Sequence, residues 1–373
     1  MSLSVGIVGL PNVGKSTLFN ALLSKQQAFA ANYPFATIEP NVGIVPVPDE
    51  RLAVLAPIVA TTKLVPATVT FLDIAGLVKG ASQGEGLGNK FLAHIREASV
   101  ILHVVRAFSD PNVVQTGSGE AIEDYLTIET ELQLADLATL EKQNPPSSRK
   151  SGTLQGQERQ EVARWSAVQK LKEGLAKGIS ARMIELSEAE NEAAKELFLL
   201  TAKPTLFALN IGEEAVSSVH SDTVSQFVRQ MREKQVEILE SDCIAICAKL
   251  EEELAGFDEA EKKEYLQSAG IERTGLETLI AAAYKRLGLQ SYLTAGELEV
   301  RAWTITQGAS APEAAGVIHT DFMKHFISAK VCNYSDFVEY NGWKGAAEKG
   351  KVRTEGKGYI MQDGDIVEFM IGK

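Results

Sequence analysis

The chain has 373 residues, which suggests roughly two or three domains at about 150 residues each. It is 45% hydrophobic and 23% charged, as is usual for globular proteins, and no apolar run approaches the roughly 18 residues of a membrane span. The net charge of −12 argues against a general nucleic-acid coat but leaves room for a local basic surface. The first expected strand begins without a signal peptide, and Cys243, Cys247 and Cys332 lack metal-ligand spacing. We therefore expect a cytoplasmic protein without a membrane segment.

The strongest motif lies near the N-terminus, where residues 9–17 fit the phosphate-binding pattern G-x-x-x-x-G-K-[ST]. The apolar run 5–8 predicts a buried strand before the motif, and residues 16–23 predict a helix after it. Glycines let backbone N–H groups surround an anion, and the helix N-terminus adds positive potential. We expect Lys15 to reach the terminal phosphates and the Ser16 hydroxyl to bind Mg²⁺. The predicted phosphate-binding residues are Asn12, Val13, Gly14, Lys15, Ser16 and Thr17.

Three stretches of the chain differ in their hydrophobic pattern. Short β-rich runs alternate with helical pieces over residues 1–118 and again from 204, which predicts an α/β fold with a doubly wound, mostly parallel sheet. Residues 119–203 show helical spacing, which indicates long amphipathic helices and is compatible with an antiparallel coiled coil. Alternation at 299–305 and 366–370 predicts a small α+β domain. The expected domains are therefore 1–118 with 204–288, an inserted helical domain at 119–203, and 289–373.

A D-x-x-G motif runs from Asp73 to Gly76 at the end of a predicted strand. Ligands of open α/β sheets bind at the carboxyl ends of strands, so Asp73 is a candidate Mg²⁺ ligand and Gly76 a candidate contact of the γ-phosphate. Thr37 lies in a loop that can close over Mg²⁺ in the triphosphate state. The predicted metal set is Ser16, Thr37 and Asp73. The glycine-rich residues 79–88 are read as a switch loop, with a plain flexible loop as the alternative.

Four stretches together resemble the YchF / Obg-like ATPase family of Obg-related NTPases: residues 9–17, 32–41, 73–81 and 86–92. The resemblance covers essentially the whole chain. It implies an OBG-type G domain, an inserted coiled-coil domain and a C-terminal TGS domain, which is a β-grasp module whose signatures resemble residues 319–322 and 363–367. It also implies binding to the ribosome, its large subunit or RNA, through the TGS and coiled-coil domains. We expect a monomer.

The nucleotide base is expected at residues 210–213, which read N-x-x-E. Guanine-specific relatives carry N-K-x-D there, and the Asp of that motif accepts two hydrogen bonds from guanine. Because the Lys is missing and Glu213 replaces the Asp, the resemblance implies that ATP is bound in preference to GTP. It further implies that Asn210 hydrogen-bonds the base and that the backbone near Ile211 meets the adenine edge, with Ala248 and Lys249 closing the pocket. The alternative is that Asn210 only caps the next helix.

The residues expected to support hydrolysis are Lys15, Asp73 and Gln115. Lys15 is the main electrostatic residue for the transition state. Leu77 stands where Ras-like enzymes carry a water-orienting Gln, and Gln115 stands where many bacterial relatives carry a His, so we expect slow turnover with a modest contribution from Gln115. Asn12 resembles an Asn that ligates K⁺ beside the phosphates in related NTPases.

These predictions together indicate a Mg²⁺-dependent ATP-hydrolysing switch that is associated with ribosomes. Two alternatives stay open: a GTPase of the Obg class, and a nucleotide-gated RNA- or ribosome-binding adaptor with negligible catalysis. Residues 341–357 are rich in Lys, and Tyr340 and Trp343 lie beside these basic residues in the sequence. They are a candidate RNA-facing edge, or else an ordinary solvated hairpin.

Overall fold

The computed structural model describes residues 3–32, 41–74, 87–146, 156–216 and 220–372. The chain forms two compact units, and each unit is built from segments that are far apart in the sequence. The first unit comprises the described parts of Met1–Ser24, Thr37–Gly43 and Thr70–Leu276. The second comprises the described parts of Lys25–Ala36, Ile44–Val69 and Glu277–Lys373.

A six-stranded sheet carries the phosphate-binding motif and has the strand order β2-β4-β1-β5-β6-β7. Strand β1 pairs in parallel with β4 on one side and with β5 on the other, and β5–β6 and β6–β7 are also parallel pairs. The predicted α/β class with a mostly parallel sheet is confirmed. Because the strand order reverses at β1, a crevice is expected at the carboxyl ends of these strands. The strands are β1 (Ser4–Val8), β2 (Val42–Pro46), β4 (Thr68–Asp73), β5 (Val100–Ala107), β6 (Thr205–Ile211) and β7 (Cys243–Ile246).

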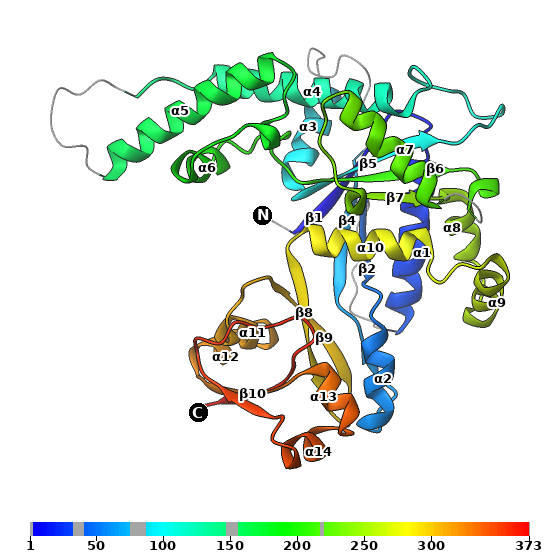
Figure 1. The fold of residues 1–373 in the computed structure, drawn as a ribbon, viewed down its shortest axis with the longest axis vertical. Helices are drawn as coiled ribbons and strands as arrows, with labels where there is room; N and C mark the ends of the chain where they lie inside the picture. The colour runs from blue at the N-terminus through cyan, green and yellow to red at the C-terminus, as the bar shows by residue number, and fades with distance from the viewer. Residues whose placement is uncertain (1–2, 33–40, 75–86, 147–155, 217–219, 373) are drawn as a thin grey trace. The chain divides into compact units, whose positions relative to one another are not determined.

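Helices α4 and α7 pack against β5, β6 and β7 of this sheet, and Figure 1 shows α7 beside β6. The apolar core between them includes Val105, Phe207 and Leu209 from the strands, with Tyr125 and Phe227 from the helices. This packing fixes the strands whose carboxyl ends carry the candidate site. The helices up to residue 286 are α1 (Lys15–Asn32), α2 (Glu50–Ile58), α3 (Leu87–Glu97), α4 (Ala121–Glu141), α5 (Gly156–Ala176), α6 (Glu188–Lys195), α7 (His220–Glu233), α8 (Ala248–Leu254), α9 (Glu259–Ala269) and α10 (Gly275–Arg286), with short 3₁₀ turns η1 (Ala181–Met183), η2 (Glu213–Ala215) and η3 (Glu240–Asp242).

The inserted region is helical, as the sequence predicts, and its described residues between 121 and 201 contain no strand. Helices α4 and α5 run antiparallel. Arg164 of α5 donates to the Gln143 side chain just after α4 over 2.9 Å, whereas Gln133, earlier on α4, donates to the Gly178 carbonyl after α5 over 3.0 Å. A capping box of Ser187 and Glu190 begins α6.

The second unit contains a mixed sheet with the order β11-β10-β12-β8-β9-β3. Strand β12 is parallel to β8, whereas β8–β9, β10–β12 and β10–β11 are antiparallel, which confirms the predicted α+β character of the C-terminal residues. Strand β3 (Leu64–Val65) comes from the N-terminal half and pairs in parallel with β9, and the sequence did not predict it because two residues carry no alternation. The other strands are β8 (Leu289–Ala295), β9 (Val300–Thr306), β10 (Phe326–Cys332), β11 (Arg353–Glu355) and β12 (Ile366–Ile371).

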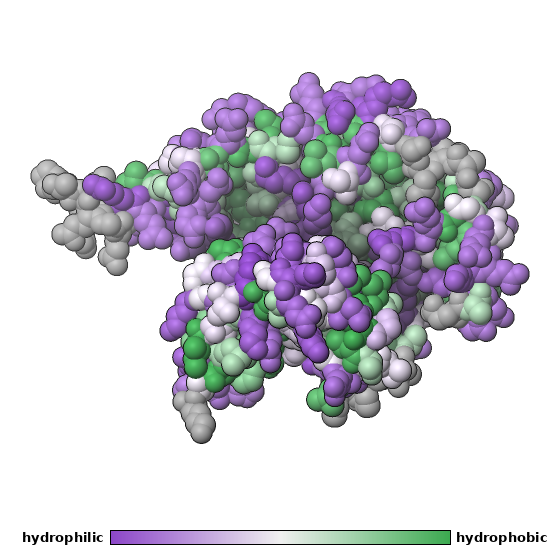
Figure 2. Space-filling view, turned by 60° about the horizontal axis from the view of Figure 1, so that its bottom comes forward, coloured by the Kyte–Doolittle hydropathy of each residue, from purple (hydrophilic) through white to green (hydrophobic). Residues whose placement is uncertain are grey.

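Helices α11 (Ala311–Ile318) and α12 (Thr320–Lys324) precede β10, and α13 (Tyr334–Glu339) and α14 (Trp343–Glu348) follow it. Hydrophilic side chains dominate the face drawn in Figure 2, with smaller hydrophobic areas between them. Among the described helices, none has the length and apolar character needed to cross a membrane.

Candidate functional site

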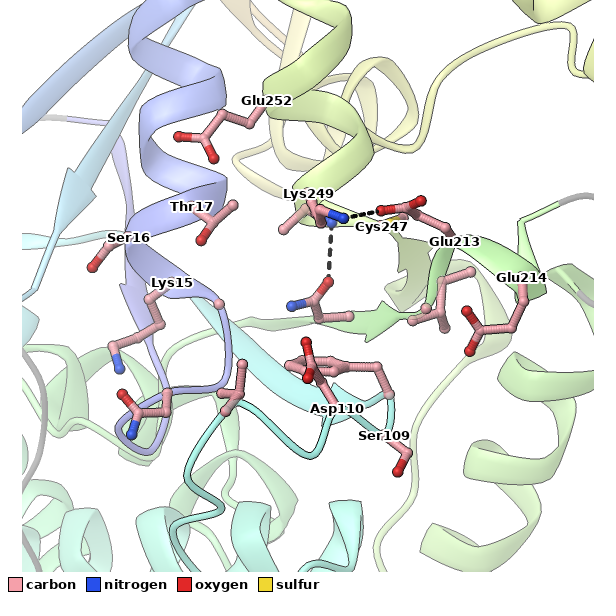
Figure 3. A pocket seen from close by; sticks show the side chains of 18 residues that line it. Lys15, Ser16, Thr17, Ser109, Asp110, Glu213, Glu214, Cys247, Lys249 and Glu252 are labelled. Atoms are coloured by element: carbon pink, nitrogen blue, oxygen red, sulfur yellow. Dashed lines mark hydrogen bonds and ion pairs between the residues drawn. The ribbon is translucent and has the colours of Figure 1, made fainter.

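A cavity of about 660 Å³ lies at the carboxyl ends of β1, β5, β6 and β7. Figure 3 shows the phosphate-loop side chains on one side of it and Glu213 and Glu214 on the other. The cavity therefore forms where a doubly wound sheet is expected to bind its ligand. Four segments line it: the phosphate loop, the loop after β5, the turn after β6 and the start of α8, through Asn12, Gly14, Lys15, Ser16, Thr17, Phe108, Ser109, Asp110, Val113, Asn210, Ile211, Gly212, Glu213, Glu214, Cys247, Ala248, Lys249 and Glu252.

The phosphate loop turns tightly through two residues with left-handed backbone, Asn12 (φ 62°) and Gly14 (φ 100°). A side chain at Gly14 is excluded, because its Cβ would lie 2.1 Å from the Asn210 amide nitrogen. The Lys15 ammonium folds back along the loop and donates to the Leu10 carbonyl over 2.7 Å. Burial lowers the pKa of Lys15, while the Asp73 carboxylate raises it. The loop thus places a largely buried cation beside the start of α1, where an anion is stabilised.

Asn210 joins the phosphate loop to the opposite wall of the cavity. Its amide donates to the Val13 carbonyl over 2.9 Å, and its oxygen accepts from the backbone N–H of Ala248, the first residue of α8, over 3.0 Å. The alternative from the sequence, that Asn210 caps the next helix, is not what this contact shows, because Ala248 begins α8 and the helical elements η2 and α7 come first. A hydrogen bond from Asn210 to the base stays a prediction. One of the two hydrogens of its side-chain amide is not used by the bond to Val13 and could make it.

The end of the cavity away from the phosphate loop has apolar walls and a charged rim. Phe108 and the buried Ile211 supply apolar surface, and the Arg106 guanidinium lies 4.2 Å from the centre of the Phe108 ring. At the rim, the Lys249 ammonium pairs with the Glu213 carboxylate over 2.7 Å (Figure 3). Apolar walls of this kind can pack against the faces of a planar aromatic base, and the charged rim can discriminate between bases by the hydrogen-bonding groups on their edges.

Arg106 shapes the loop after β5, a role that the sequence analysis missed. Its guanidinium donates to the carbonyls of Phe108, Asp110 and Val113 over 3.3–3.4 Å. The same loop is tied to the phosphate loop, because the Asn12 amide donates to the Val114 carbonyl over 3.2 Å. An arginine at the end of a buried strand was the available signal, since a buried guanidinium needs several acceptors.

Of the three predicted metal ligands, Ser16 lines the cavity, whereas Asp73 is not among its lining residues but lies on β4, the neighbour of β1. Ser16 is exposed at the start of α1, and Asp73 ends β4, where burial raises the pKa of the carboxyl and Lys15 lowers it. Among the described residues, no hydrogen bond reaches the Asp73 carboxylate, and no group of three or more His, Cys, Asp or Glu could enclose a metal. This set of few, hard oxygen donors fits Mg²⁺, which usually binds one or two carboxylates together with nucleotide phosphates. Thr37 and Gly76 lie outside the described residues.

Comparisons with known proteins identify the family. Residues 4–142 match the family model described as 50S ribosome-binding GTPase, and residues 289–372 match the YchF-GTPase C-terminal model, described as a protein of unknown function (DUF933). A Bacillus subtilis (strain 168) protein named "Ribosome-binding ATPase YchF" is 47% identical over 99% of both chains. The chain belongs to the YchF family.

Further YchF relatives match over the same length. The proteins of this name from Haemophilus influenzae and Escherichia coli O157:H7 are 47% and 46% identical, each over 99% of both chains. A solved structure of the Schizosaccharomyces pombe YchF GTPase superposes with a TM-score of 0.86 at 36% identity, covering 99% of this chain and 97% of that one. The predicted YchF resemblance is confirmed, and the names of these relatives disagree on whether the nucleotide is ATP or GTP.

Gln115 is not brought into the cavity of this YchF chain. Its side chain is exposed and lies beside Gly119 of its own loop, where a Cβ on Gly119 would come within 1.9 Å of the Gln115 amide nitrogen. It is absent from the residues that line the cavity among those described. A contribution of Gln115 to hydrolysis stays a prediction.

Residues 341–357 are the candidate RNA edge, for which the sequence offered an ordinary hairpin as the alternative. The segment begins with helix α14 and is not a simple hairpin. The Trp343 ring is half-buried and packs edge-on against Phe337, with 5.3 Å between ring centres, and the Lys351 ammonium pairs with Asp336 over 3.2 Å. Binding of RNA by this edge stays a prediction.

Proposed function

We propose that this YchF-family chain is a Mg²⁺-dependent ATP-binding and ATP-hydrolysing switch that associates with ribosomes. The observation that carries the proposal is a cavity that holds a buried phosphate-loop lysine at one end and the Glu213–Lys249 pair at the other. Relatives of equal length carry the name "Ribosome-binding ATPase", which supports both the nucleotide and the partner.

The base end of the cavity supports ATP over GTP. Recognition of guanine needs acceptors for two neighbouring N–H groups, and a carboxylate supplies them best when it is unpaired. Glu213, the carboxylate that replaces the guanine-reading Asp of relatives, is held by Lys249. The Lys that follows the Asn in the N-K-x-D motif is also missing, since the residue after Asn210 is the buried Ile211. A GTPase of the Obg class is the second candidate, favoured by the name of the structurally similar Schizosaccharomyces pombe YchF GTPase.

Hydrolysis would use residues at the phosphate end. The phosphate-loop N–H groups and the Lys15 ammonium orient the triphosphate and stabilise the charge that develops on the transferred phosphoryl group. Water attacks the γ-phosphorus and the bond to the β-phosphate oxygen breaks, which releases ADP and phosphate. Ser16, Asp73 and Thr37 would hold Mg²⁺, which when bound neutralises the β- and γ-phosphate oxygens. We also propose K⁺ beside Asn12 as a further positive charge.

Titration of the full chain with fluorescent ATP and GTP analogues in Mg²⁺ tests this proposal. Clearly tighter binding of ATP than of GTP supports the proposal. Equal or tighter binding of GTP contradicts it and favours the alternative that the chain is a GTPase of the Obg class. Turnover in K⁺ and in Na⁺ tests the role of Asn12, because equal rates would remove K⁺ from the proposal.

Ribosome association is tested by sedimentation of the full chain with ribosomal subunits through a sucrose cushion, with and without ATP. Nucleotide-dependent pelleting with stimulated ATP turnover is expected. Pelleting without measurable turnover would favour the adaptor alternative. We propose the helical insertion and the C-terminal domain as the contact regions.

A further inference from the structure

One ion pair crosses the base end of the cavity. Glu213 begins the 3₁₀ turn η2 after β6, and Lys249 is the second residue of α8 after β7, so the pair links two loops that follow neighbouring strands. The ammonium and carboxylate are 2.7 Å apart, and both side chains line the cavity (Figure 3). Lys249 also lies 3.9 Å from Glu253, one turn further along α8, which does not line the cavity.

The charges around this pair give Lys249 a particular position. Asp110 and Glu214 also line this part of the cavity, and the Glu214 carboxylate lies over its own turn, 2.2 Å from where a Cβ on Gly212 would be. Among the described residues that line the cavity, Lys15 and Lys249 are the only cations. Because Lys15 lies in the phosphate loop, Lys249 is the cation that faces the carboxylates at the base end.

Guanine and adenine differ in the hydrogen-bond donors and acceptors that their Watson–Crick edges would present to the Glu213–Lys249 pair. The Watson–Crick edge of guanine offers two adjacent donors, N1–H and the N2 amino group, which a carboxylate accepts with its two oxygens. Adenine offers one donor, at N6, and an acceptor at N1. An ammonium group has donors only, so it opposes the donor edge of guanine and tolerates the acceptor of adenine.

We propose that Lys249 is a specificity-determining residue, which holds the Glu213 carboxylate in an ion pair and so withholds it from the donor edge of guanine. This inference rests on the proposed preference for ATP. An exposed ion pair is a modest barrier, because water competes with both partners. We therefore expect Lys249 to account for about a five- to tenfold part of the discrimination.

Replacement of Lys249 by Met tests the inference, because Met keeps much of the length and loses the charge. The readout is the ratio of the Kd for GTP to the Kd for ATP. Both nucleotides carry the same triphosphate, so a general change in attraction cancels in this ratio. We expect Lys249→Met to lower the ratio about five- to tenfold, with Lys249→Arg retaining the wild-type ratio. ITP, which lacks the N2 amino group, should gain less than GTP.

Two further variants assign the effect to the pair. In Lys249→Met/Glu213→Gln the ratio should return toward the wild-type value, because the carboxylate that accepts the guanine donors is gone. Glu253→Gln is the matched control, since it removes the other carboxylate near Lys249 without touching the cavity, and its ratio should match the wild type. If Lys249→Met binds nucleotides too weakly to measure, Lys249→Gln provides the same comparison.

The outcomes separate this inference from the proposed function. A wild-type chain that prefers GTP overturns the proposed ATP preference before any variant is made. A wild-type chain that prefers ATP, with a Lys249→Met ratio that is unchanged or raised, overturns the role of Lys249 and leaves the ATP preference standing. A fall in the ratio that persists in the double variant also overturns it, because Glu213 would then not be the group released.

Discussion

The Asn210 amide donates a hydrogen bond to the Val13 carbonyl over 2.9 Å, although 197 positions separate the two residues. The same side chain accepts from Ala248, so it holds the phosphate loop at a fixed distance from α8. In this way the phosphate end and the base end of the cavity are coupled through one buried amide. The position of the phosphate loop therefore depends on strand β6, which follows the helical insertion in the sequence.

We predict that Asn210→Ala lowers the free energy of unfolding by about 2–4 kcal/mol, because it leaves the Val13 carbonyl and the Ala248 N–H without their partner. ATP affinity should fall at least tenfold. Urea denaturation and ATP titration measure the two effects. Asn20→Ala is the matched control: its amide donates to Glu252 at the exposed surface over 3.2 Å, and its loss should cost less than about 0.5 kcal/mol. Equal losses in the two variants would contradict the proposed coupling.

Gly14→Ala should abolish measurable ATP binding and destabilise the fold. The substitution forces a left-handed backbone on alanine and drives its Cβ to 2.1 Å from the Asn210 amide. Gly178→Ala separates the two causes, since Gly178 is also left-handed (φ 79°) but has no atom within 4 Å of its added Cβ. We expect about 1–2 kcal/mol from backbone strain alone in Gly178→Ala, with unchanged ATP affinity. Thermal unfolding and ATP titration of both variants distinguish clash from strain.

The sequence predicts the parts of this site whose residues are close together in the chain better than the parts whose residues come from distant segments. The phosphate loop and the first strand and helix are contiguous, so one motif is enough to bring Lys15 and Ser16 together at the wall of the cavity. The Glu213–Lys249 pair joins two loops that meet only because β6 and β7 pair in parallel. Nothing in either loop alone indicates the other, and the sequence therefore predicts both as pocket residues but not as partners.

The remaining differences have similar physical origins. The resemblance puts Gln115 at the position of a His in many bacterial relatives, whereas in the structure its loop is held by Arg106 and Asn12 and its own side chain lies beside Gly119. Strand β3 is too short to carry a periodic pattern, yet it finds a partner at the edge of the second sheet. The β3–β9 pairing and the Asn12–Val114 hydrogen bond join distant segments, and no local pattern in the sequence indicates them.

Asp73→Asn should separate metal binding from folding. Burial raises the pKa of Asp73 and among the described residues its carboxylate accepts no hydrogen bond, so loss of the charge should change the free energy of unfolding by less than about 1 kcal/mol. At an ATP concentration about 100 times the wild-type Kd, ATP with Mg²⁺ should stabilise the wild-type fold by about 2.7 kcal/mol. In Asp73→Asn this stabilisation should be smaller by at least about 1.4 kcal/mol, which corresponds to a tenfold loss of affinity. Turnover should fall at least about 100-fold.

Thermal unfolding with ATP, in Mg²⁺ and in EDTA, measures this effect. The wild type and Asp73→Asn should respond alike to ATP in EDTA and differ in Mg²⁺. Asp110→Asn is the control, because it removes a carboxylate that lines the cavity away from the phosphate loop. If Asp73→Asn kept the full Mg²⁺ response, Asp73 would not be a metal ligand.

His103 should make the stability of the fold depend on pH. It lies on β5 between the rings of Tyr125 and Phe207, and within the described parts of the chain neither ring nitrogen has a hydrogen-bond partner. Burial lowers the pKa of His103 to about 4, with Glu129 opposing the shift and Arg182 adding to it. The unfolded chain, with a pKa near 6.5, therefore takes up a proton at this residue between about pH 6.5 and pH 4 while the folded chain does not. Stability from this group is full above pH 6.5 and is lost as the pH falls.

From these pKa values, the wild type should lose about 2 kcal/mol of unfolding free energy through His103 between pH 7.5 and pH 5. His103→Phe keeps an aromatic ring between Tyr125 and Phe207 and cannot be protonated, so its urea-denaturation midpoint should fall less over the same range. His94→Gln changes an exposed histidine on α3 and should keep the wild-type pH dependence. An unaltered pH dependence in His103→Phe would show that His103 is protonated in the fold, with Glu129, 3.9 Å away, as its counter-ion.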